Sequence, residues 1–256
     1  MSDLTRFYDE LAPHYHLLFE DWDAAVRWQG GVLDRLLGRL AGPGRKRVLD
    51  AASGIGTQAI GLALEGHAVT GSDLSPASVE RARWEAKRLG VEVAFEVADF
   101  RDLSRAVAGP FDVVCALDNA LPHLESDAEL AAALGQMAGL LAPDGLFLAS
   151  TRDYDALARR RPERMSERVY PDGQGRRRVY QLWDWDANGS GYRVRQHIVR
   201  EGGVAREPLV FSAHYRALTR AQLSAALEAA GLGNPEWLMP ADSGFYQPVV
   251  AARRRP

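Results

Sequence analysis

Apolar side chains recur along the chain at two different spacings, and the change between them predicts the elements. From residue 4 to residue 40 the large apolar positions are mostly three, four or seven apart, the spacing that forms one face of a helix. Gly42-Pro43-Gly44 predicts the end of the second helix of this region. From Arg47 onward, short apolar runs alternate with helical stretches. That alternation is typical of strands connected by helices.

The alternating region predicts five strands of one sheet. We expect strands that begin at Val48 and at 67–71, 91–97, 111–117 and 146–150, with helices at 57–64, 76–89 and 125–141. Because strands joined by helices are connected by right-handed crossovers, this sheet should be mostly parallel.

The pattern changes after Thr151. Three further strand-like runs follow, at 179–186, 192–200 and 209–218, and turn-forming residues separate them. Short turns between strands predict an antiparallel meander. A helix over about 219–230 follows, with Thr219 as its N-cap, and 236–239 and 247–252 predict a closing antiparallel pair.

Together these elements predict an α/β fold. We expect a Rossmann-like, mostly parallel seven-stranded sheet with helices on both faces, plus an inserted antiparallel β cap. The corresponding division is N-terminal lid helices and a ligand-binding core in 1–150, the cap in 151–216, and the last helix and closing strands of the core in 217–256.

Composition excludes several classes of protein. Hydrophobic residues make up 46% of the chain and charged residues 25%, an ordinary globular balance that excludes a disordered chain. No apolar run approaches the ~20 residues of a bilayer helix. The first residues lack a secretion signal, so we expect a cytoplasmic protein with no membrane partner. A single cysteine, Cys115, excludes an internal disulfide framework, and no spacing typical of metal ligands is present.

Charge is distributed unevenly. The formal net charge is −3, which argues against a nucleic-acid binder held by a global positive field. Residues 151–216 nevertheless hold 14 Arg against 9 Asp and Glu, which leaves 17 basic and 25 acidic residues elsewhere. Because these arginines alternate with acids, we expect a solvated cap surface rather than a phosphate site.

The most informative segment is a strand that leads into two glycines and then a helix. Gly54 and Gly56 predict a turn where the backbone approaches a ligand closely and a helix N-terminus faces it. With Ala59 and with Asp73, 19 residues after Gly54, the segment also fits the fingerprint of an NAD site.

Asp50 favours a different ligand. It ends the first strand, four residues before Gly54, where a carboxylate would repel a pyrophosphate and attract a cation. S-adenosylmethionine carries an ammonium and a sulfonium, and its ribose hydroxyls need an acidic partner, for which Asp73 is placed. One cationic nucleoside would account for both carboxylates. The alternative is that Asp50 only caps the turn.

Several motifs occur in a familiar order. They are Val48-Leu49-Asp50 with Gly54-x-Gly56, Gly71-Ser72-Asp73-Leu74-Ser75, Ala98-Asp99-Phe100, 111–117, and Leu140-Leu141-Ala142-Pro143-Asp144-Gly145-Leu146. In them the chain resembles the class I S-adenosylmethionine-dependent methyltransferases. The resemblance implies that Asp99 hydrogen-bonds the adenine amino group and that Phe100 lies beside the ring. It also implies a cofactor site that includes Ala52, Gly54, Gly56, Leu74 and Leu117, although many members have glycine at the position of Ala52.

Two segments narrow the resemblance. Residues 117–124 and 151–155 are similar to the corresponding segments of glycine N-methyltransferases. That similarity implies that Asn119 and Arg152 hold an amino-acid substrate, with Arg152 paired to its carboxylate, and that His123 lies near the substrate. Asp118 replaces the glycine usual in that family, and a second carboxylate there either repels an anionic ligand or engages an amine. An arginine is suited to the first task because it binds a carboxylate through two parallel hydrogen bonds.

Aromatic and histidine residues supply further candidates. Residues 7–15 are similar to the lid segment of small-molecule methyltransferases, which implies that Tyr15, together with Trp28, closes over the cofactor. In the cap, Trp185 and Tyr215 are candidates for lining an aromatic substrate pocket. For all four the alternative is ordinary core packing. His123 and His214 are the candidates for accepting a proton, with solvent as the alternative.

These observations predict an enzyme that transfers a methyl group from S-adenosylmethionine to a small metabolite that carries an amine or a carboxylate. An amino acid of the glycine or sarcosine type fits best. The alternatives are an O- or N-methyltransferase acting on a larger secondary metabolite and a non-catalytic S-adenosylmethionine-binding protein. An NAD-dependent oxidoreductase is disfavoured by Asp50. A base-flipping DNA methyltransferase is disfavoured because 118–122 lacks the usual Pro-Pro-aromatic run. The oligomeric state stays open.

Overall fold

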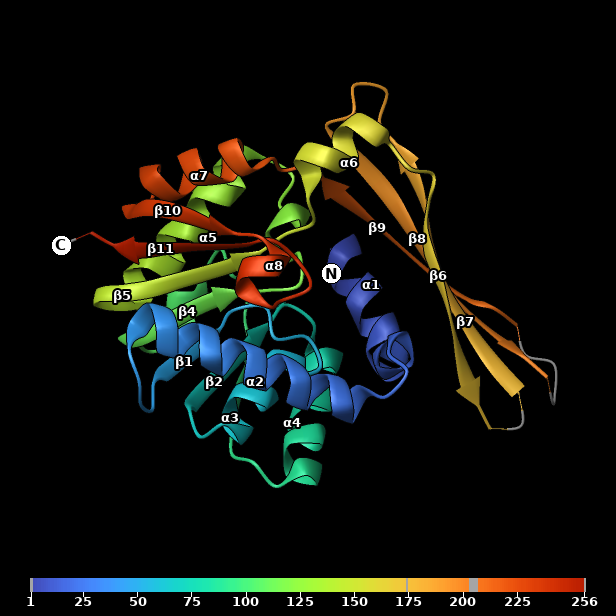
Figure 1. Cartoon of the computed structure of the whole chain (residues 1–256), viewed down its shortest axis with the longest axis horizontal. Helices are drawn as coiled ribbons and strands as arrows, with labels where there is room; N and C mark the ends of the chain where they lie inside the picture. Colours follow the sequence, from blue (N-terminus) through green and yellow to red (C-terminus); the bar gives the residue numbers. More distant parts are fainter. Residues whose placement is uncertain (1, 174, 203–206, 256) are drawn as a thin grey trace.

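The computed structural model describes residues 2–173, 175–202 and 207–255. Its strands form two sheets (Figure 1). The larger, called the core sheet here, has seven strands in the order β10-β11-β5-β4-β1-β2-β3. Its strands are β1 (Arg47–Asp50), β2 (Ala68–Asp73), β3 (Ala94–Val97), β4 (Phe111–Ala116), β5 (Leu141–Ser150), β10 (Leu232–Leu238) and β11 (Val249–Arg254). The pairs among β3, β2, β1, β4 and β5 are parallel, and β11 is antiparallel to both β5 and β10. The predicted mostly parallel seven-stranded sheet is confirmed.

Helices cover both faces of the core sheet, as predicted. They are α2 (Trp22–Ala41), α3 (Thr57–Leu64), α4 (Pro76–Leu89), α5 (Asp127–Leu140) and α7 (Arg220–Ala229), with the short η2 (Leu103–Arg105), η3 (Leu121–His123) and α8 (Pro240–Ser243). Side chains of a strand point alternately to the two faces, so Val113 packs with α2, α3 and α4 whereas Val114 packs with α5 and α7. Both faces are therefore buried, which explains the nearly continuous apolar runs of these strands.

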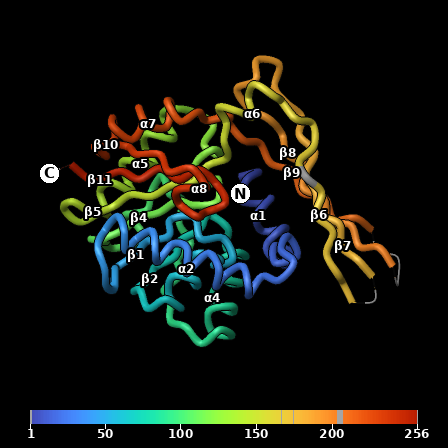
Figure 2. Tube along the Cα trace, viewed as in Figure 1, coloured from blue at the N-terminus to red at the C-terminus, as the bar shows by residue number. Residues whose placement is uncertain are grey.

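The second sheet, called the cap here, has four antiparallel strands in the order β6-β7-β8-β9. They are β6 (Arg164–Asp172), β7 (Gly175–Trp185), β8 (Gly191–Glu201) and β9 (Leu209–Arg216). The chain leaves the core after β5, passes through α6 (Tyr154–Arg160) into the cap, and returns from β9 to α7, a path that Figure 2 follows.

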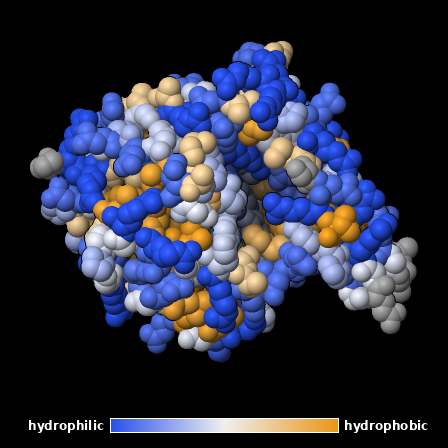
Figure 3. Space-filling model, in the orientation of Figure 1, coloured by the Kyte–Doolittle hydropathy of each residue, from blue (hydrophilic) through white to orange (hydrophobic). Residues whose placement is uncertain are grey.

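The first helices, α1 (Asp3–Leu11) and the 3-10 helix η1 (Ala12–Leu18), lie between the core and the cap (Figure 1). Phe7, Leu11 and Leu17 pack against Trp183 and Tyr192 of the cap. The cap therefore completes its hydrophobic cluster only with help from the N-terminal segment. Outside, the surface is hollowed between core and cap, and most of the visible face is hydrophilic (Figure 3).

Some elements differ from those that the pattern predicts. β6 and α6 were not predicted, because β6 is rich in charged residues and its Val169 is 53% exposed, so it lacks a clear apolar alternation. The predicted helical region 4–40 is broken by η1 and by residues 19–21, the last of which, Asp21, caps α2. β5 begins at Leu141 rather than at Leu146. In the described ranges, no helix is long and apolar enough to cross a membrane.

Candidate active site

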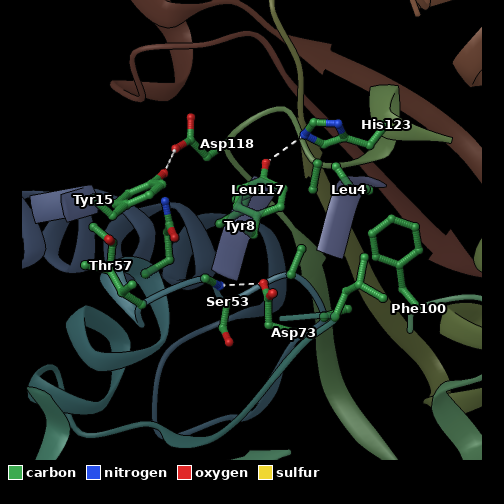
Figure 4. Close-up of a pocket in the computed structure, with 17 residues that line it drawn as sticks. Leu4, Tyr8, Tyr15, Ser53, Thr57, Asp73, Phe100, Leu117, Asp118 and His123 are labelled. Carbon is green, nitrogen blue, oxygen red and sulfur yellow. Dashed lines mark hydrogen bonds between the residues drawn. The ribbon is translucent and has the colours of Figure 1, made fainter. Parts of the chain in front are cut away.

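A pocket opens where the core strands end. Its lining comes from α1 and η1, from the turn after β1, and from the ends of β2, β3 and β4 (Figure 4). The residues are Leu4, Tyr8, Tyr15, Ala51, Ala52, Ser53, Gly54, Ile55, Thr57, Gln58, Asp73, Leu74, Phe100, Leu117, Asp118, Ala120 and His123. Open parallel sheets bind their ligands at this edge, beside the point where the strand order reverses.

The glycine turn forms the floor of the pocket. Gly54 and Gly56 have positive φ angles of +52° and +94°, a backbone region that glycine adopts without steric cost. A Cβ atom on Gly56 would lie 2.7 Å from Cδ1 of Ile60, so a side chain there would force Ile60 to move. The turn leads directly into α3, whose N-terminal backbone faces the pocket side.

Asp73 ties the end of β2 to this turn. One of its carboxylate oxygens accepts a hydrogen bond from the Gly54 amide (2.8 Å) and the other accepts one from the Ser75 amide (2.9 Å). Burial raises the pKa of Asp73 to about 6. Because a carboxylate has more acceptor positions than these two amides use, it can still accept hydrogen bonds from a ligand in the pocket.

Asp50 lies beneath the turn and is 1% exposed. Its Oδ1 accepts a long hydrogen bond from the Ala52 amide (3.4 Å), and its Oδ2 has no hydrogen-bond partner among the described residues. Burial raises the pKa of Asp50 to about 7. A buried carboxylate oxygen without a partner is costly, and a cation nearby would lower that cost. The observation fits a positively charged ligand above the turn.

Two tyrosines of the N-terminal segment project toward the pocket. The Tyr15 hydroxyl donates to Oδ2 of Asp118 at 3.0 Å (Figure 4). The Tyr8 hydroxyl lies 2.7 Å from Nε2 of His123. Both contacts join the N-terminal segment to the residues after β4, so the segment covers the pocket from the cap side.

The hydrogen bonds of His123 assign its tautomer. Its Nδ1 lies 3.3 Å from the backbone carbonyl oxygen of His214, which only accepts, so Nδ1 carries the proton and Nε2 accepts from Tyr8. Burial lowers the pKa of His123 to about 3, and the imidazole is therefore neutral at physiological pH. Tyr215 packs on the same ring, with 4.0 Å between ring centroids.

Asn119 connects the pocket to a second group of polar residues. Its Oδ1 accepts from the Arg152 amide (3.0 Å) and from the Tyr154 hydroxyl (2.9 Å). Its Nδ2 is buried and has no partner among the described residues. An amide donor that is buried and unsatisfied at the edge of a pocket is available to a ligand acceptor.

Arg152 lies among aromatic rings of the cap. Its guanidinium donates to the Tyr192 hydroxyl (2.6 Å) and to Oε1 of Gln181 (3.1 Å). It also lies 4.8 Å from the ring centre of Trp183 and 5.1 Å from that of Tyr215. In the described residues, no carboxylate comes within salt-bridge distance of it. Arg152 is therefore a half-buried cation without an anionic partner.

Sequence comparison assigns the family of the region that contains the turn. Residues 48–145 match the family described as "Methyltransferase domain". The glycine/sarcosine N-methyltransferase of Parasynechococcus marenigrum is 34% identical over 157 residues. These residues are 61% of this chain and 52% of that protein. Residues 48–145 belong to a class I S-adenosylmethionine-dependent methyltransferase domain. The chain spans about half the length of the curated relative that it matches.

Solved structures agree with the methyltransferase domain in fold. An S-adenosylmethionine-dependent methyltransferase from Clostridium acetobutylicum superposes with a TM-score of 0.74 over 90% of this chain and 92% of that chain, at 13% identity. An amino pentose methyltransferase from Micromonospora echinaspora, solved with S-adenosylmethionine bound, superposes with a TM-score of 0.71 at 21% identity, over 89% and 91% of the two chains. Each covers about nine-tenths of this chain, so the shared fold extends well beyond residues 48–145.

The structure brings many of the predicted site residues to one pocket and places others elsewhere. Those lining the pocket are Tyr15, Ala52, Gly54, Asp73, Leu74, Phe100, Leu117 and His123. Trp28 is 48% exposed, packs on Tyr246 and is not among the residues that line the pocket. The side chain of His214 points to Asp186 (3.2 Å), and Trp185 donates to the Pro162 carbonyl (3.0 Å). Their predicted roles stay predictions.

Asp99 also lies outside the pocket lining. Arg101 donates to it from its backbone amide (2.8 Å) and from its guanidinium. Burial acts to raise the pKa of Asp99, but the hydrogen bonds from Arg101 outweigh it and lower the pKa. An ionised Asp99 held by a guanidinium is a hydrogen-bond acceptor of fixed orientation. Its predicted contact with adenine stays a prediction.

Several pocket residues were not singled out from the sequence. Tyr8 lies within the segment that resembles a lid, where the resemblance implies a cofactor-covering role for Tyr15. Thr57 and Gln58 belong to the first turn of α3, where any residue facing the ligand is a candidate. Asp118 departs from the family pattern, and that departure is the signal in the sequence that points to it.

Proposed function

We propose that this protein transfers a methyl group from S-adenosylmethionine to the nitrogen of a small amino acid of the glycine or sarcosine type. The observation that carries the proposal is Arg152, a half-buried guanidinium without a carboxylate partner beside the pocket of a methyltransferase domain. The curated relative from Parasynechococcus marenigrum is a glycine/sarcosine N-methyltransferase, which supports this substrate class.

The cofactor would occupy the pocket above the glycine turn. The turn itself, Asp73, Leu74 and Phe100 would hold the adenosine, and Asp50 would stabilise the positive charge from beneath. When bound, S-adenosylmethionine supplies a methyl group on a positively charged sulfur. The unsatisfied oxygen of Asp50 and the open space at the Cβ position of Gly54 are the structural features that fit this ligand.

The acceptor would be oriented by its carboxylate. Arg152 donates two hydrogen bonds to cap residues and has further N–H groups free to form a pair with a carboxylate. Asn119 Nδ2 would provide another donor. Because aromatic rings exclude water around the guanidinium, the attraction between it and a carboxylate is stronger than on the surface.

The remaining task of the chain is to position the acceptor and exclude water. Holding reactants in alignment lowers a barrier by roughly 7–11 kcal/mol in well-oriented model reactions. Tyr8 and Tyr15 would close the pocket. His123, with a pKa lowered to about 3 by burial, is a weak base. We assign it the role of orienting Tyr8, and solvent, rather than His123, would take the proton of the acceptor amine.

The test is methyl transfer from S-adenosylmethionine to glycine and sarcosine, followed as S-adenosylhomocysteine formed. In Arg152→Gln, we expect the acceptor KM to rise roughly 10- to 100-fold, because a charge-assisted hydrogen bond to the carboxylate is lost. The affinity for S-adenosylhomocysteine should change little. Arg193→Gln, at an exposed arginine of β8, is the matched control.

Two results would contradict the proposal. An unchanged acceptor KM in Arg152→Gln would remove the carboxylate assignment. Tight binding of S-adenosylhomocysteine without methylation of any amino acid by the wild type would favour a cofactor-binding protein of another role.

A further inference from the structure

We infer that the carboxylate of Asp118 binds the amine of the acceptor and selects nitrogen over hydroxyl acceptors. The inference rests on the proposed function, because it concerns the same pocket. It adds a residue that the family resemblance does not supply, since glycine is usual at this position in the glycine N-methyltransferases that the segment resembles.

Asp118 is held in the pocket by an uncommon backbone conformation. It lies two residues after Ala116, the end of β4, and both Asp118 and Asn119 have positive φ angles, +53° and +67°. The Asp118 amide donates to Oγ of Ser150 at 2.7 Å, and the Asn119 amide donates to the Ser150 carbonyl at 3.0 Å. Two successive left-handed residues other than glycine persist only where surrounding contacts hold them, and such positions are concentrated at functional sites.

Neutral groups surround the carboxylate. Oδ2 accepts from the Tyr15 hydroxyl (3.0 Å) and Oδ1 accepts from the Gln247 side chain (3.2 Å). No Lys, Arg or His of the described ranges forms a salt bridge with it. Burial raises the pKa of Asp118, although hydrogen bonds from Tyr246, Tyr15 and Gln247, and the charge of Arg152, act in the opposite direction. About four acceptor positions exist on a carboxylate, so a position remains for a ligand donor.

The described protein groups around Asp118 include no positively charged donor in contact with it, and a ligand could supply one. Burial of a carboxylate without a cation is unfavourable, and an ammonium supplies both the positive charge and the hydrogen atoms. The bound ammonium would then give one proton to solvent, because only the neutral amine has the lone pair that accepts a methyl group. A hydroxyl also donates a hydrogen bond but brings no charge. The pocket should therefore prefer an amine to the corresponding alcohol.

Asp118 and Arg152 together present the two charges of an amino acid. β4 and β5 are neighbouring parallel strands, and each of these residues lies just past the carboxyl end of its strand. Asn119 joins them, because its Oδ1 accepts from the Arg152 amide. The guanidinium is nevertheless directed to Tyr192 and Gln181 and not to Asp118. An unpaired anion and an unpaired cation at adjacent strand ends suit a ligand that carries both an amine and a carboxylate.

A purely structural role for Asp118, as the acceptor for Tyr15, is distinguishable by one substitution. Asp118→Asn keeps an oxygen that accepts from the Tyr15 hydroxyl, and asparagine tolerates positive φ. It removes the charge and replaces the oxygen that accepts from Gln247 with an NH2 group. Asp144→Asn is the matched control, because Asp144 is exposed and also has a positive φ of +58°.

The experiment measures binding of three small probes in the presence of S-adenosylhomocysteine: glycine, glycolate (a hydroxyl in place of the amine) and glycinamide (an amine without a carboxylate). The proteins are the wild type, Asp118→Asn, Arg152→Gln and Asp144→Asn. We expect Asp118→Asn to weaken glycine and glycinamide roughly 10- to 100-fold and to leave glycolate unchanged or tighter. Arg152→Gln should weaken glycine and glycolate and leave glycinamide unchanged.

The outcomes separate this inference from the proposed function. The role of Asp118 is overturned if the wild type does not bind the amine probes more tightly than glycolate. It is also overturned if the wild type binds none of the probes. A loss in Asp118→Asn that is equal for glycine and glycolate, or no loss for glycine, overturns it too. If glycinamide binds and depends on Asp118 while Arg152→Gln leaves glycine unchanged, Asp118 keeps its role and the carboxylate assignment fails. If the wild type methylates glycine and Asp118→Asn binds glycine as tightly as the wild type does, the proposed function holds and the role of Asp118 fails.

Discussion

Buried acidic residues define the site at the scale of single residues. Asp50, Asp73 and Asp118 are each held by backbone or neutral donors, and burial raises the pKa of each. A buried carboxylate is usually paired with a cation, so three buried carboxylates around a single pocket without a cationic partner among the described residues are unusual. Their common explanation is a cationic ligand.

The pH dependence of stability tests this explanation. Burial raises the pKa of Asp50 to about 7, above the ~3.9 of an exposed aspartate. The folded state then holds the proton more tightly than the unfolded state. This contribution to stability is complete below about pH 4 and is lost as pH rises through about 7. In ligand-free protein, we expect the free energy of unfolding in urea to fall less between pH 5 and pH 8 in Asp50→Asn than in the wild type.

Asp242→Asn, at an exposed surface residue, is the control for that comparison. The same acid should affect the ligand in the opposite direction, because only the ionised carboxylate attracts a cation. Binding of S-adenosylhomocysteine should weaken as pH falls below about 7 in the wild type and depend less on pH in Asp50→Asn. Equal pH slopes in the two proteins would show that Asp50 does not titrate in this range.

At the scale of elements, close packing of α2 and α3 supports the glycine turn. A Cβ on Gly61 of α3 would lie 2.6 Å from the Val26 carbonyl oxygen, and one on Gly30 of α2 would lie 2.4 Å from the Gly61 carbonyl oxygen. The two backbones are in contact, and α3 begins at the turn. The position of the glycine turn therefore depends on Gly30 and Gly61, two glycines that do not line the pocket.

We expect Gly61→Ala to lower the free energy of unfolding by about 1–3 kcal/mol, because the added methyl forces the two helices apart. Gly135→Ala is the matched control. Gly135 lies within α5, is exposed and has open space at its Cβ position, so alanine should stabilise that helix by roughly 0.5–1 kcal/mol. Chemical denaturation measures both values. A Gly61→Ala protein as stable as the wild type would contradict the backbone contact.

At the scale of the whole molecule, the N-terminal segment joins the two sheets. Phe7 and Leu11 pack with the cap cluster, whereas Asp9 on the same helix accepts from the Ser75 hydroxyl (2.6 Å) and the Ala77 amide (3.1 Å). The latter two groups are at the N-terminus of α4, where the helix dipole favours a negative charge. Because α1 lies between core and cap (Figure 1) and supplies Tyr8 to the pocket, closure of the pocket depends on both.

Asp9→Ala should release α1 from the core. Because Tyr8 and Tyr15 line the pocket from this segment, we expect the Kd for S-adenosylhomocysteine to rise about tenfold, as one or two hydrogen bonds to a charged group are lost. Faster limited proteolysis near the N-terminus should accompany this loss. Glu10→Ala, at the neighbouring exposed position, should leave both measurements unchanged. Equal protection in both variants would show that the cap contacts alone hold the segment.

The sequence by itself determined the elements of the core and the glycine turn. The spacing of apolar residues and the residue types in turns act locally, so α3 and α4 have the bounds that the pattern predicts. For the same reason Gly54 and Gly56 have the positive φ angles that such a turn requires. The capping box at Thr219 is local in the same way. The family resemblance indicated the cofactor through motifs that lie in these same local segments.

Only the tertiary structure decided which side chains meet. His214 contributes its backbone carbonyl to His123 while its side chain turns to Asp186, and Trp28 lies on the exposed face of α2. β6 forms because β7 offers it a partner, although its own residues alternate poorly. Asp118 meets Tyr15 across 103 positions and Gln247 across 129. Side-chain direction and long-range pairing depend on how helices and sheets pack, and no local pattern of residues specifies that.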